Sequence, residues 1–210
     1  MVISIDGMSG TGKSTISYLL ANKLHLGCLN SGSIYRCIAL KIINKEETLE
    51  NIIENIEKLD IKFINKEDKQ LVYLDNKDVT EEIRKEEVSV FTPTIANNQE
   101  LKKGIRKLQA VFVNKGNIII EGRDIAVRIA PNADYKFYLT TSLDVRAQRL
   151  YKEKKERENI TYEEIYNDLK QRDEKDIEDG NFIKPTDAIN IDTSNLTPDE
   201  VIDLMLSYIK

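Results

Sequence analysis

Residues 7–14 read Gly-Met-Ser-Gly-Thr-Gly-Lys-Ser and match the pattern G-x-x-x-x-G-K-[ST] at every fixed position. Glycines in such a loop let backbone N–H groups converge on a polyphosphate, and the N-terminus of a following helix adds a favourable dipole. Lys13 would then reach the β and γ phosphates, and the Ser14 hydroxyl would bind Mg²⁺. The motif predicts a site for a nucleoside triphosphate. Its expected contacts are Gly7, Met8, Ser9, Gly10, Thr11, Gly12, Lys13, Ser14 and Thr15.

The segments on either side of this loop support that interpretation. Residues 2–5 are Val-Ile-Ser-Ile, which is typical of a short buried strand. Residues 15–24 carry apolar side chains at positions 16, 19, 20 and 24, which is helical spacing. The alternative is a flexible Gly/Ser turn between strand and helix. The strand–loop–helix context favours the phosphate-binding loop.

Further apolar runs occur at residues 118–120, 137–139 and 188–191, and helical segments lie between and after them, ending with 198–209. Strands that alternate with helices predict an α/β protein with a parallel sheet covered on both faces. Residues 45–90 differ from this pattern. A helix is expected over 48–59, followed by strands at 61–64 and 70–74 around a polar turn at 65–69. This segment predicts an insert that contains a hairpin.

The composition limits the class of protein. The chain has 210 residues, a net charge of −5 and 40% apolar residues, which suffices for one domain with embellishments or two small ones. No apolar run is long enough to span a membrane, and the first residues do not resemble a secretory signal. Cys28 and Cys37 alone make neither a disulfide framework nor a four-ligand zinc site. We expect a cytoplasmic monomer with no membrane partner.

The charge is distributed unevenly along the chain. Residues 149–178 hold eighteen charged side chains, eight basic and ten acidic, so this stretch must be solvated or must meet a charged ligand. The acidic balance, together with the mixture of basic and acidic side chains in the stretch, argues against a nucleic-acid partner.

Three further segments indicate where an acceptor of phosphate would bind. Asn-Ser-Gly-Ser-Ile-Tyr-Arg at 30–36 begins a helix for which Ser31 is the expected N-cap. Glu-Gly-Arg-Asp at 121–124 follows the strand 118–120, and ligands bind at the carboxyl ends of strands in open α/β sheets. Arg-Asp-Glu-Lys-Asp at 172–176 lies near the end of the charged stretch.

The order IDGMSGTGKST, SGSIYR, DVTEEIR, EGRDI and RDEKD resembles the bacterial cytidylate kinases, nucleoside monophosphate kinases of the P-loop class, over nearly the whole chain. The resemblance implies a three-layer P-loop NTPase-type fold with a core (1–44, 91–148 and 183–210), an insert for the nucleoside monophosphate (45–90) and a helical lid (149–182). It also implies transfer of the γ-phosphoryl group of ATP to CMP or dCMP, with Mg²⁺.

The resemblance also implies roles for single residues. Phosphoryl transfer needs positioning and charge neutralisation more than a covalent nucleophile, and arginine forks match phosphate oxygens. The implied catalytic residues are Lys13, Arg123 and Arg172. The implied acceptor-binding residues are Ser31, Arg36, Lys102, Arg123, Asp124, Arg172 and Asp176. The implied magnesium residues are Ser14 and Glu121, and Arg149, with Arg146 beside it, is a candidate for the ATP side.

Each role has a structural alternative. An arginine on a surface is more often a solvated ion-pair partner than a ligand, which applies above all to Arg146 and Arg149. By the resemblance, the carboxylate of Asp124 accepts a hydrogen bond from the exocyclic amine of cytosine. The alternative is that Asp124 only orients Arg123. Asp176 could belong to a solvated acidic face instead of binding the sugar hydroxyls.

The chain departs from the family pattern at four places. Thr92-Pro93-Thr94 stand in the segment where the family usually has a serine; Pro93 cannot donate there, and either threonine is a candidate substitute. Lys102 stands where an arginine is usual, and Ile125-Ala126-Val127 follow the Gly-Arg-Asp segment where Met/Ile-Gly-Thr is usual. Asp179 stands where the lid usually has a further arginine. A reversed charge about 6 Å from a bound anion costs on the order of 3 kcal/mol at an effective dielectric constant of 20. Either Lys175 or Lys184 compensates, or the acceptor site has changed.

These departures keep two other functions open. One is a kinase of the same class that acts on another nucleoside monophosphate or another small acceptor. The other is a homologue that binds ATP without catalysis. Arg36, Arg123 and Arg172 together argue against the second, because a binder needs no arginines placed for a transition state.

Overall fold

The computed structural model describes residues 1–66, 69–156 and 159–210. The middle of the turn predicted at 65–69 and two residues of the charged stretch 149–178 lie outside the described residues. The chain forms two compact units, one of Met1–Val2 and Ala21–Ile120 and the other of Ile3–Leu20 and Glu121–Lys210. No helix in the described part of the chain is both long enough and apolar enough to cross a membrane.

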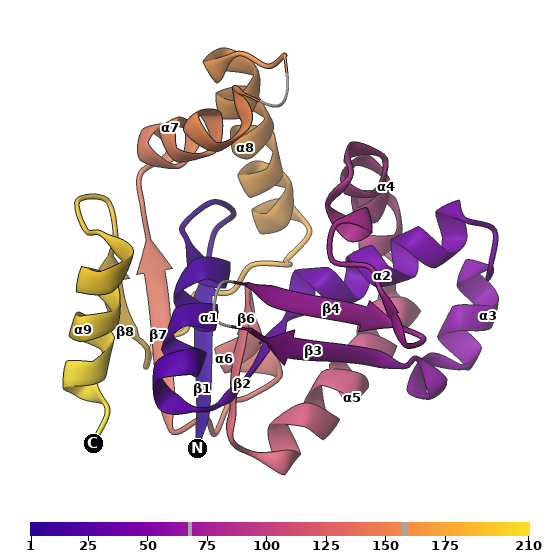
Figure 1. The fold of residues 1–210 in the computed structure, drawn as a ribbon, viewed down its shortest axis with the longest axis horizontal. Helices are drawn as coiled ribbons and strands as arrows, with labels where there is room; N and C mark the ends of the chain where they lie inside the picture. The colour runs from indigo at the N-terminus through magenta and orange to yellow at the C-terminus, as the bar shows by residue number, and fades with distance from the viewer. Residues whose placement is uncertain (67–68, 157–158) are drawn as a thin grey trace. The chain divides into compact units, whose positions relative to one another are not determined.

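The second unit is built on parallel strands (Figure 1). Strand β1 (Val2–Gly7) pairs in parallel with β7 (Tyr135–Thr140), which pairs in parallel with β8 (Ile189–Asp192), so Ile5, Phe137 and Ile189 share one register. The five-stranded sheet has the order β2-β6-β1-β7-β8, with β6 formed by Ile118–Gly122. The predicted parallel strands are confirmed.

Helices cover these strands or follow them. Helix α1 (Lys13–Leu24) begins where the glycine-rich loop ends, and the short α6 (Ile125–Arg128) follows the Gly-Arg-Asp segment. Helix α9 (Pro198–Tyr208) packs on the sheet, where the ring of Tyr208 lies 6.5 Å from that of Phe137.

The charged stretch forms two helices that lie side by side, α7 (Leu143–Lys154) and α8 (Tyr162–Glu178) (Figure 1). They bury a small apolar cluster around Ala147, Ile165 and Leu169. Helix α8 begins with a capping box, in which Thr161 and Glu164 each accept a backbone N–H of the other residue.

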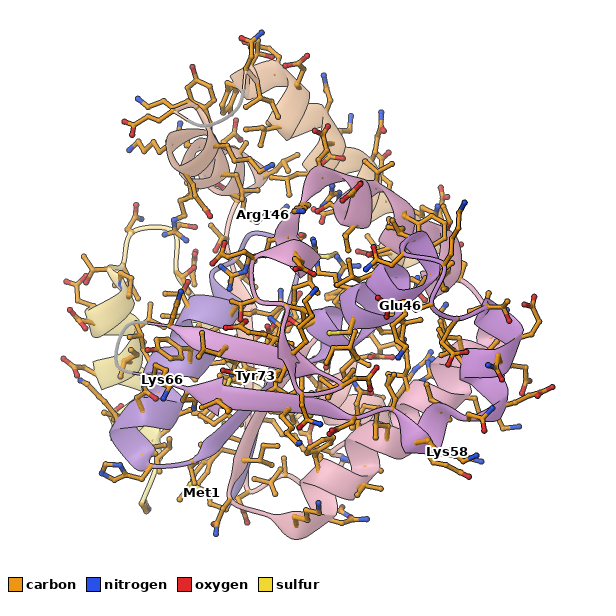
Figure 2. All side chains as sticks on the ribbon, turned by 45° about the vertical axis from the view of Figure 1, so that its right-hand side comes forward. Met1, Glu46, Lys58, Lys66, Tyr73 and Arg146 are labelled. Carbon is orange, nitrogen blue, oxygen red and sulfur yellow. The ribbon has the colours of Figure 1, made fainter. Side chains whose placement is uncertain are left out.

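The first unit carries the predicted hairpin. Strands β3 (Ile61–Asn65) and β4 (Gln70–Leu74) are antiparallel neighbours (Figure 1), and Tyr73 is labelled on β4 in Figure 2. A third strand, β5 (Lys77–Asp78), was not predicted. Asp75 and Asn76 both have positive φ angles, 50° and 64°, and make a two-residue turn of the kind that suits hairpins.

The remaining elements of this unit are mostly helical. Strand β2 (Gly27–Asn30) leads into α2 (Ser31–Ile43), and the segment predicted as one helix at 48–59 is α3 (Leu49–Glu54) plus a 3₁₀ turn, η1 (Ile56–Lys58). A second 3₁₀ turn, η2 (Glu82–Arg84), precedes α4 (Glu86–Ala96) and α5 (Gln99–Lys115).

The predicted cap of α2 is wrong by one residue. Asn30 is the N-cap, because its side-chain oxygen accepts the backbone N–H of Ser33 at 2.9 Å. Ser31 is the first residue of the helix. Asparagine and serine are both strong caps, so the sequence did not distinguish the two positions.

Candidate active site

The glycine-rich loop joins β1 to α1 as predicted. A side chain at Gly7 would place its Cβ 2.5 Å from the carbonyl oxygen of Leu139, so only glycine fits beside β7. Gly10 has a φ angle of 77°, which glycine adopts without strain. The sequence therefore needs glycine at these positions for backbone reasons, and the loop that results leads directly into the N-terminus of α1.

Lys13 is held inside this loop. Its Nζ donates to the carbonyl oxygen of Met8 at 2.7 Å, and the hydroxyl of Thr11 donates to the same oxygen at 2.9 Å. Burial lowers the pKa of Lys13 to about 8, while the nearby carboxylate of Glu121 opposes that shift and Arg123 adds to it. The ammonium group is thus fixed over the loop, among other charged side chains.

Ser14 and Glu121 bring two side-chain oxygens together next to Lys13. The Ser14 hydroxyl donates to Glu121 Oε1 at 2.7 Å, and Glu121 is 4% exposed. Burial raises the pKa of Glu121, and Lys13 and Ser14 oppose that shift. Within the described residues, no three His, Cys, Asp or Glu side chains are grouped to hold a metal. Two such oxygens would be a partial set of ligands for a hard cation that keeps water and phosphate oxygens in its coordination sphere.

Asp6 is a site residue that the sequence analysis did not identify. Its two carboxylate oxygens accept the backbone N–H groups of Ile125 and Ala126, both at 2.8 Å, and the residue is fully buried. Desolvation raises the pKa of Asp6 to about 6, against the effect of those hydrogen bonds. Asp6 therefore ties the strand before the phosphate-binding loop to the segment after Arg123. Its signal in the sequence is a single acid at the end of an apolar strand.

Arg123 and Asp176 come together in the second unit. They form an ion pair, with Arg123 on the turn after β6 and Asp176 near the end of α8. Asp176 is 6% exposed, and burial raises its pKa while Arg123 lowers it. Asp124 pairs with Arg128 of α6. The buried position of Asp176 is not that of a solvated acidic face.

The other arginines of this unit have different partners. Arg172 pairs with Asp168 one turn earlier on α8, and both side chains are about half exposed. Arg149 donates to the carbonyl oxygen and hydroxyl of Thr193. Arg146, labelled in Figure 2, donates to the carbonyl oxygen of Ser9 at 2.9 Å and to Asp173 at 2.6 Å. Arg146 therefore links the phosphate-binding loop to α8.

The Arg146–Asp173 pair gives a prediction about stability. Both side chains are largely buried, 6% and 15% exposed, so Arg146→Ala leaves a carboxylate without its partner. We expect the free energy of unfolding to fall by about 2–4 kcal/mol, measured by urea denaturation. The double variant Arg146→Ala/Asp173→Ala is the control and should recover part of that loss. A change below about 0.5 kcal/mol in the single variant would contradict this role.

The first unit holds the remaining predicted residues. Ser31 is 8% exposed, and its hydroxyl has no hydrogen-bond partner among the described residues. Arg36 donates to the carbonyl oxygen of Ile83 at 2.9 Å and to the hydroxyl of Ser89 at 2.8 Å. Lys102 lies buried on α5. The structure fixes each of these side chains within its own unit.

The departures from the family pattern also have definite places. Pro93 lies inside α4, and the hydroxyls of Thr92 and Thr94 donate to carbonyl oxygens of that helix, those of Val88 and Phe91. Asp179 is the C-cap of α8.

Known proteins resemble this chain in fold and in sequence. Among solved structures, a shikimate kinase from Bacteroides thetaiotaomicron superposes with a TM-score of 0.51 at 13% identity, covering 100% of this chain and 98% of that one. A protein from Eubacterium ventriosum gives a TM-score of 0.52 at 14% identity, covering 100% and 97%. At such identities the likeness concerns the fold alone, and the fold is the α/β type of P-loop kinases.

The sequence relatives are more specific. A cytidylate kinase from Fervidobacterium nodosum is 37% identical over 99% of this chain and 95% of its own length. One from Caldicellulosiruptor saccharolyticus is 38% identical over 97% and 93%. A family model described as cytidylate kinase matches residues 3–210. These matches cover almost the whole length of the chain and agree with its phosphate-binding loop and its Gly-Arg-Asp segment. The chain belongs to the cytidylate kinase family.

Proposed function

We propose that this protein transfers the γ-phosphoryl group of ATP to CMP or dCMP, giving ADP and CDP or dCDP. One observation carries the proposal beyond family membership. Glu121 and Arg123 lie two residues apart at the end of β6, yet Glu121 contacts Ser14 of the phosphate-binding loop whereas Arg123 pairs with Asp176 of α8. One strand end thus supplies a carboxylate to the donor side and a guanidinium to the acceptor side. The effect of Arg123 on the pKa of Lys13 supports their closeness.

The donor side fits a magnesium–triphosphate complex. The oxygens of Ser14 and Glu121 are the hard ligands that Mg²⁺ prefers, and we propose that Ser14 binds the ion directly and Glu121 through water. An ion held by these residues would supply neutralisation of the charge on the phosphates. Lys13 leaves the carbonyl of Met8 to bind phosphate oxygens, and the backbone of residues 7–15 holds the triphosphate in line for attack.

The acceptor side uses the arginines and the buried polar groups. An oxygen of the acceptor phosphate attacks the γ-phosphorus, and the bond from that phosphorus to the β–γ bridging oxygen breaks, which leaves ADP. Arg36 and Arg123 hold the acceptor phosphate, and Arg172 reaches the transferring group when the lid closes. We assign the hydroxyl of Ser31, which has no hydrogen-bond partner among the described residues, to contact with cytosine, as we do the carboxylate of Asp124. Lys102 is a further acceptor-binding residue, and Asp176 binds the sugar.

The proposal keeps the division of the chain into a core, an acceptor insert at 45–90 and a lid at 149–182. The hairpin β3–β4 and the contacts of Arg36 with Ile83 and Ser89 support an insert that is organised around the acceptor helix α2. The pairing of α7 with α8 supports a lid made of two helices. Closure of such a lid excludes water, so that phosphate reaches the nucleotide.

A pH dependence of ATP affinity follows from Lys13. Its pKa is about 8 without nucleotide, and a bound triphosphate favours the charged form, so binding above pH 8 requires uptake of a proton. We expect the Kd for ATP to be nearly constant below about pH 7.5 and to rise towards tenfold per pH unit above 8. Calorimetric titrations across that range measure it. Lys13→Arg, which stays charged, should show a flat profile, and a flat wild-type profile to about pH 9.5 would refute the role of Lys13 ionisation.

A screen of acceptors tests the function. ADP release is followed in a coupled assay with ATP, Mg²⁺ and one acceptor at a time: CMP, dCMP, UMP, AMP or shikimate. We expect CMP or dCMP to give the highest rate, well above the rate without acceptor. A preference for AMP or shikimate would indicate a different acceptor on the same fold. ATP binding without turnover for any acceptor would indicate a binding protein.

A further inference from the structure

Arg128 joins two segments of the second unit that both carry proposed acceptor residues. It is the last residue of α6, and its Nε lies 3.4 Å from Asp124 Oδ2, one helical turn earlier. Its Nη2 donates to the carbonyl oxygen of Gly180 at 3.2 Å. The guanidinium therefore contacts the Gly-Arg-Asp segment on one side and the residue that follows α8 on the other.

The end of α8 is a fixed turn. Asp179 is the C-cap, Gly180 has a φ angle of 61°, and the backbone N–H groups of Asn181 and Phe182 both donate to the carbonyl oxygen of Asp176, at 2.8 and 3.1 Å. The ring of Phe182 lies 5.9 Å from that of Tyr138 on β7. Arg128 therefore binds a defined carbonyl group of a turn that is anchored on the sheet.

A second contact joins the same two segments. Arg123, next to Asp124, pairs with Asp176, whose carbonyl oxygen organises the turn. Two neighbouring arginine contacts thus hold the end of α8 against the segment 123–128. The ion pair of Arg128 with Asp124 lies at one end of α6, whereas its hydrogen bond to Gly180 connects α6 to the turn after α8.

The charges at this place explain the need for Arg128. Asp179 lies close enough to Asp176 to contribute to raising its pKa, so its negative charge extends into the region where an anionic nucleotide is proposed to bind. Arg128 binds the residue next to Asp179 and brings a permanent positive charge to that side.

We propose that Arg128 is a positioning residue for the acceptor nucleotide, which orients the carboxylate of Asp124 towards the base and holds the end of α8, with Asp176, beside Arg123. This inference rests on the proposed function. A carboxylate held by a guanidinium keeps one orientation. It accepts a hydrogen bond from the exocyclic amine of cytosine and repels the carbonyl that uracil has in that place. Arg128 thereby contributes to the discrimination between CMP and UMP.

The kinetic test compares Arg128→Ala with Arg128→Lys and with Val127→Ala, a control on an exposed neighbour in the same helix. We expect Arg128→Ala to raise the KM for CMP about tenfold and to lower the ratio of kcat/KM between CMP and UMP several-fold. The KM for ATP should stay within about twofold. Arg128→Lys should recover part of the loss, and Val127→Ala should behave as the wild type.

Hydrogen exchange gives a second readout that needs no substrate. In the protein without nucleotide, we expect the amides of residues 180–182 to exchange about tenfold faster in Arg128→Ala than in the wild type, with other protected amides unchanged. If the wild type phosphorylates CMP but Arg128→Ala keeps its CMP constants and its CMP/UMP ratio, the inference is wrong and the proposed function stands. If no pyrimidine nucleotide is phosphorylated by the wild type, the proposed function fails. In either case, unchanged exchange of the amides of residues 180–182 in Arg128→Ala would overturn the role of Arg128 in holding this turn.

Discussion

Lys13→Ala should lower kcat for phosphoryl transfer from ATP to CMP by about a thousandfold, because the charge that neutralises the β and γ phosphates is removed from a preformed site. The ammonium group already lies in the loop, 2.7 Å from the carbonyl oxygen of Met8. Coupled measurements of ADP release at saturating ATP and CMP give the number.

The same substitution should not destabilise the folded protein. Burial lowers the pKa of Lys13 to about 8, so the folded state disfavours its charged form at neutral pH, and removal of the charge should not reduce the free energy of unfolding. Lys23→Ala, at the exposed end of the same helix, is the matched control and should keep wild-type kinetics. If Lys13→Ala kept more than about a tenth of the wild-type kcat, the assignment of Lys13 would be wrong.

Arg123→Ala should affect the acceptor far more than the donor. We expect kcat/KM for CMP to fall by about a hundredfold to a thousandfold while the KM for ATP changes less than about threefold, because a fork that matches phosphate oxygens is lost. Initial rates with each substrate varied in turn separate the two constants. The structure places Arg123 against Asp176, which is also proposed to bind the acceptor.

Two further variants separate acceptor binding from folding. Arg123→Ala leaves the buried carboxylate of Asp176 without its partner, which also costs stability, whereas Arg123→Ala/Asp176→Asn removes that charge. The double variant is a control for stability alone, because Asp176 is itself proposed to bind the acceptor. Arg123→Lys keeps the charge without the fork and should have intermediate kinetics. Wild-type CMP constants in folded Arg123→Ala would refute its role.

The sequence was most informative where a feature is contiguous. The phosphate-binding loop is encoded in eight consecutive residues, and its strand and helix follow from the apolar pattern on either side. The hairpin at β3 and β4 was predictable for the same reason. The third strand was missed because its signal is only the pair Asp75-Asn76, whose positive φ angles are not evident from composition.

The candidate site was less predictable because its contacts join distant residues. Asp6 binds the backbone of Ile125 and Ala126, and Arg146 binds the carbonyl oxygen of Ser9, more than a hundred residues away in the chain. No local pattern encodes a hydrogen bond to a backbone group at such a distance. Arg128 was overlooked in the same way, since its second partner, Gly180, has no side chain to attract notice.

Transfer of a labelled γ-phosphate tests the central claim most directly. The protein is incubated with Mg²⁺, CMP and ATP that carries the label on its γ-phosphate, and the products are separated. We predict that the label appears in CDP, in amounts equal to the ADP formed, and that Lys13→Ala forms both products about a thousandfold more slowly. Label found only in inorganic phosphate, or ADP formation that does not depend on CMP or dCMP, would contradict the proposal that this protein phosphorylates CMP or dCMP.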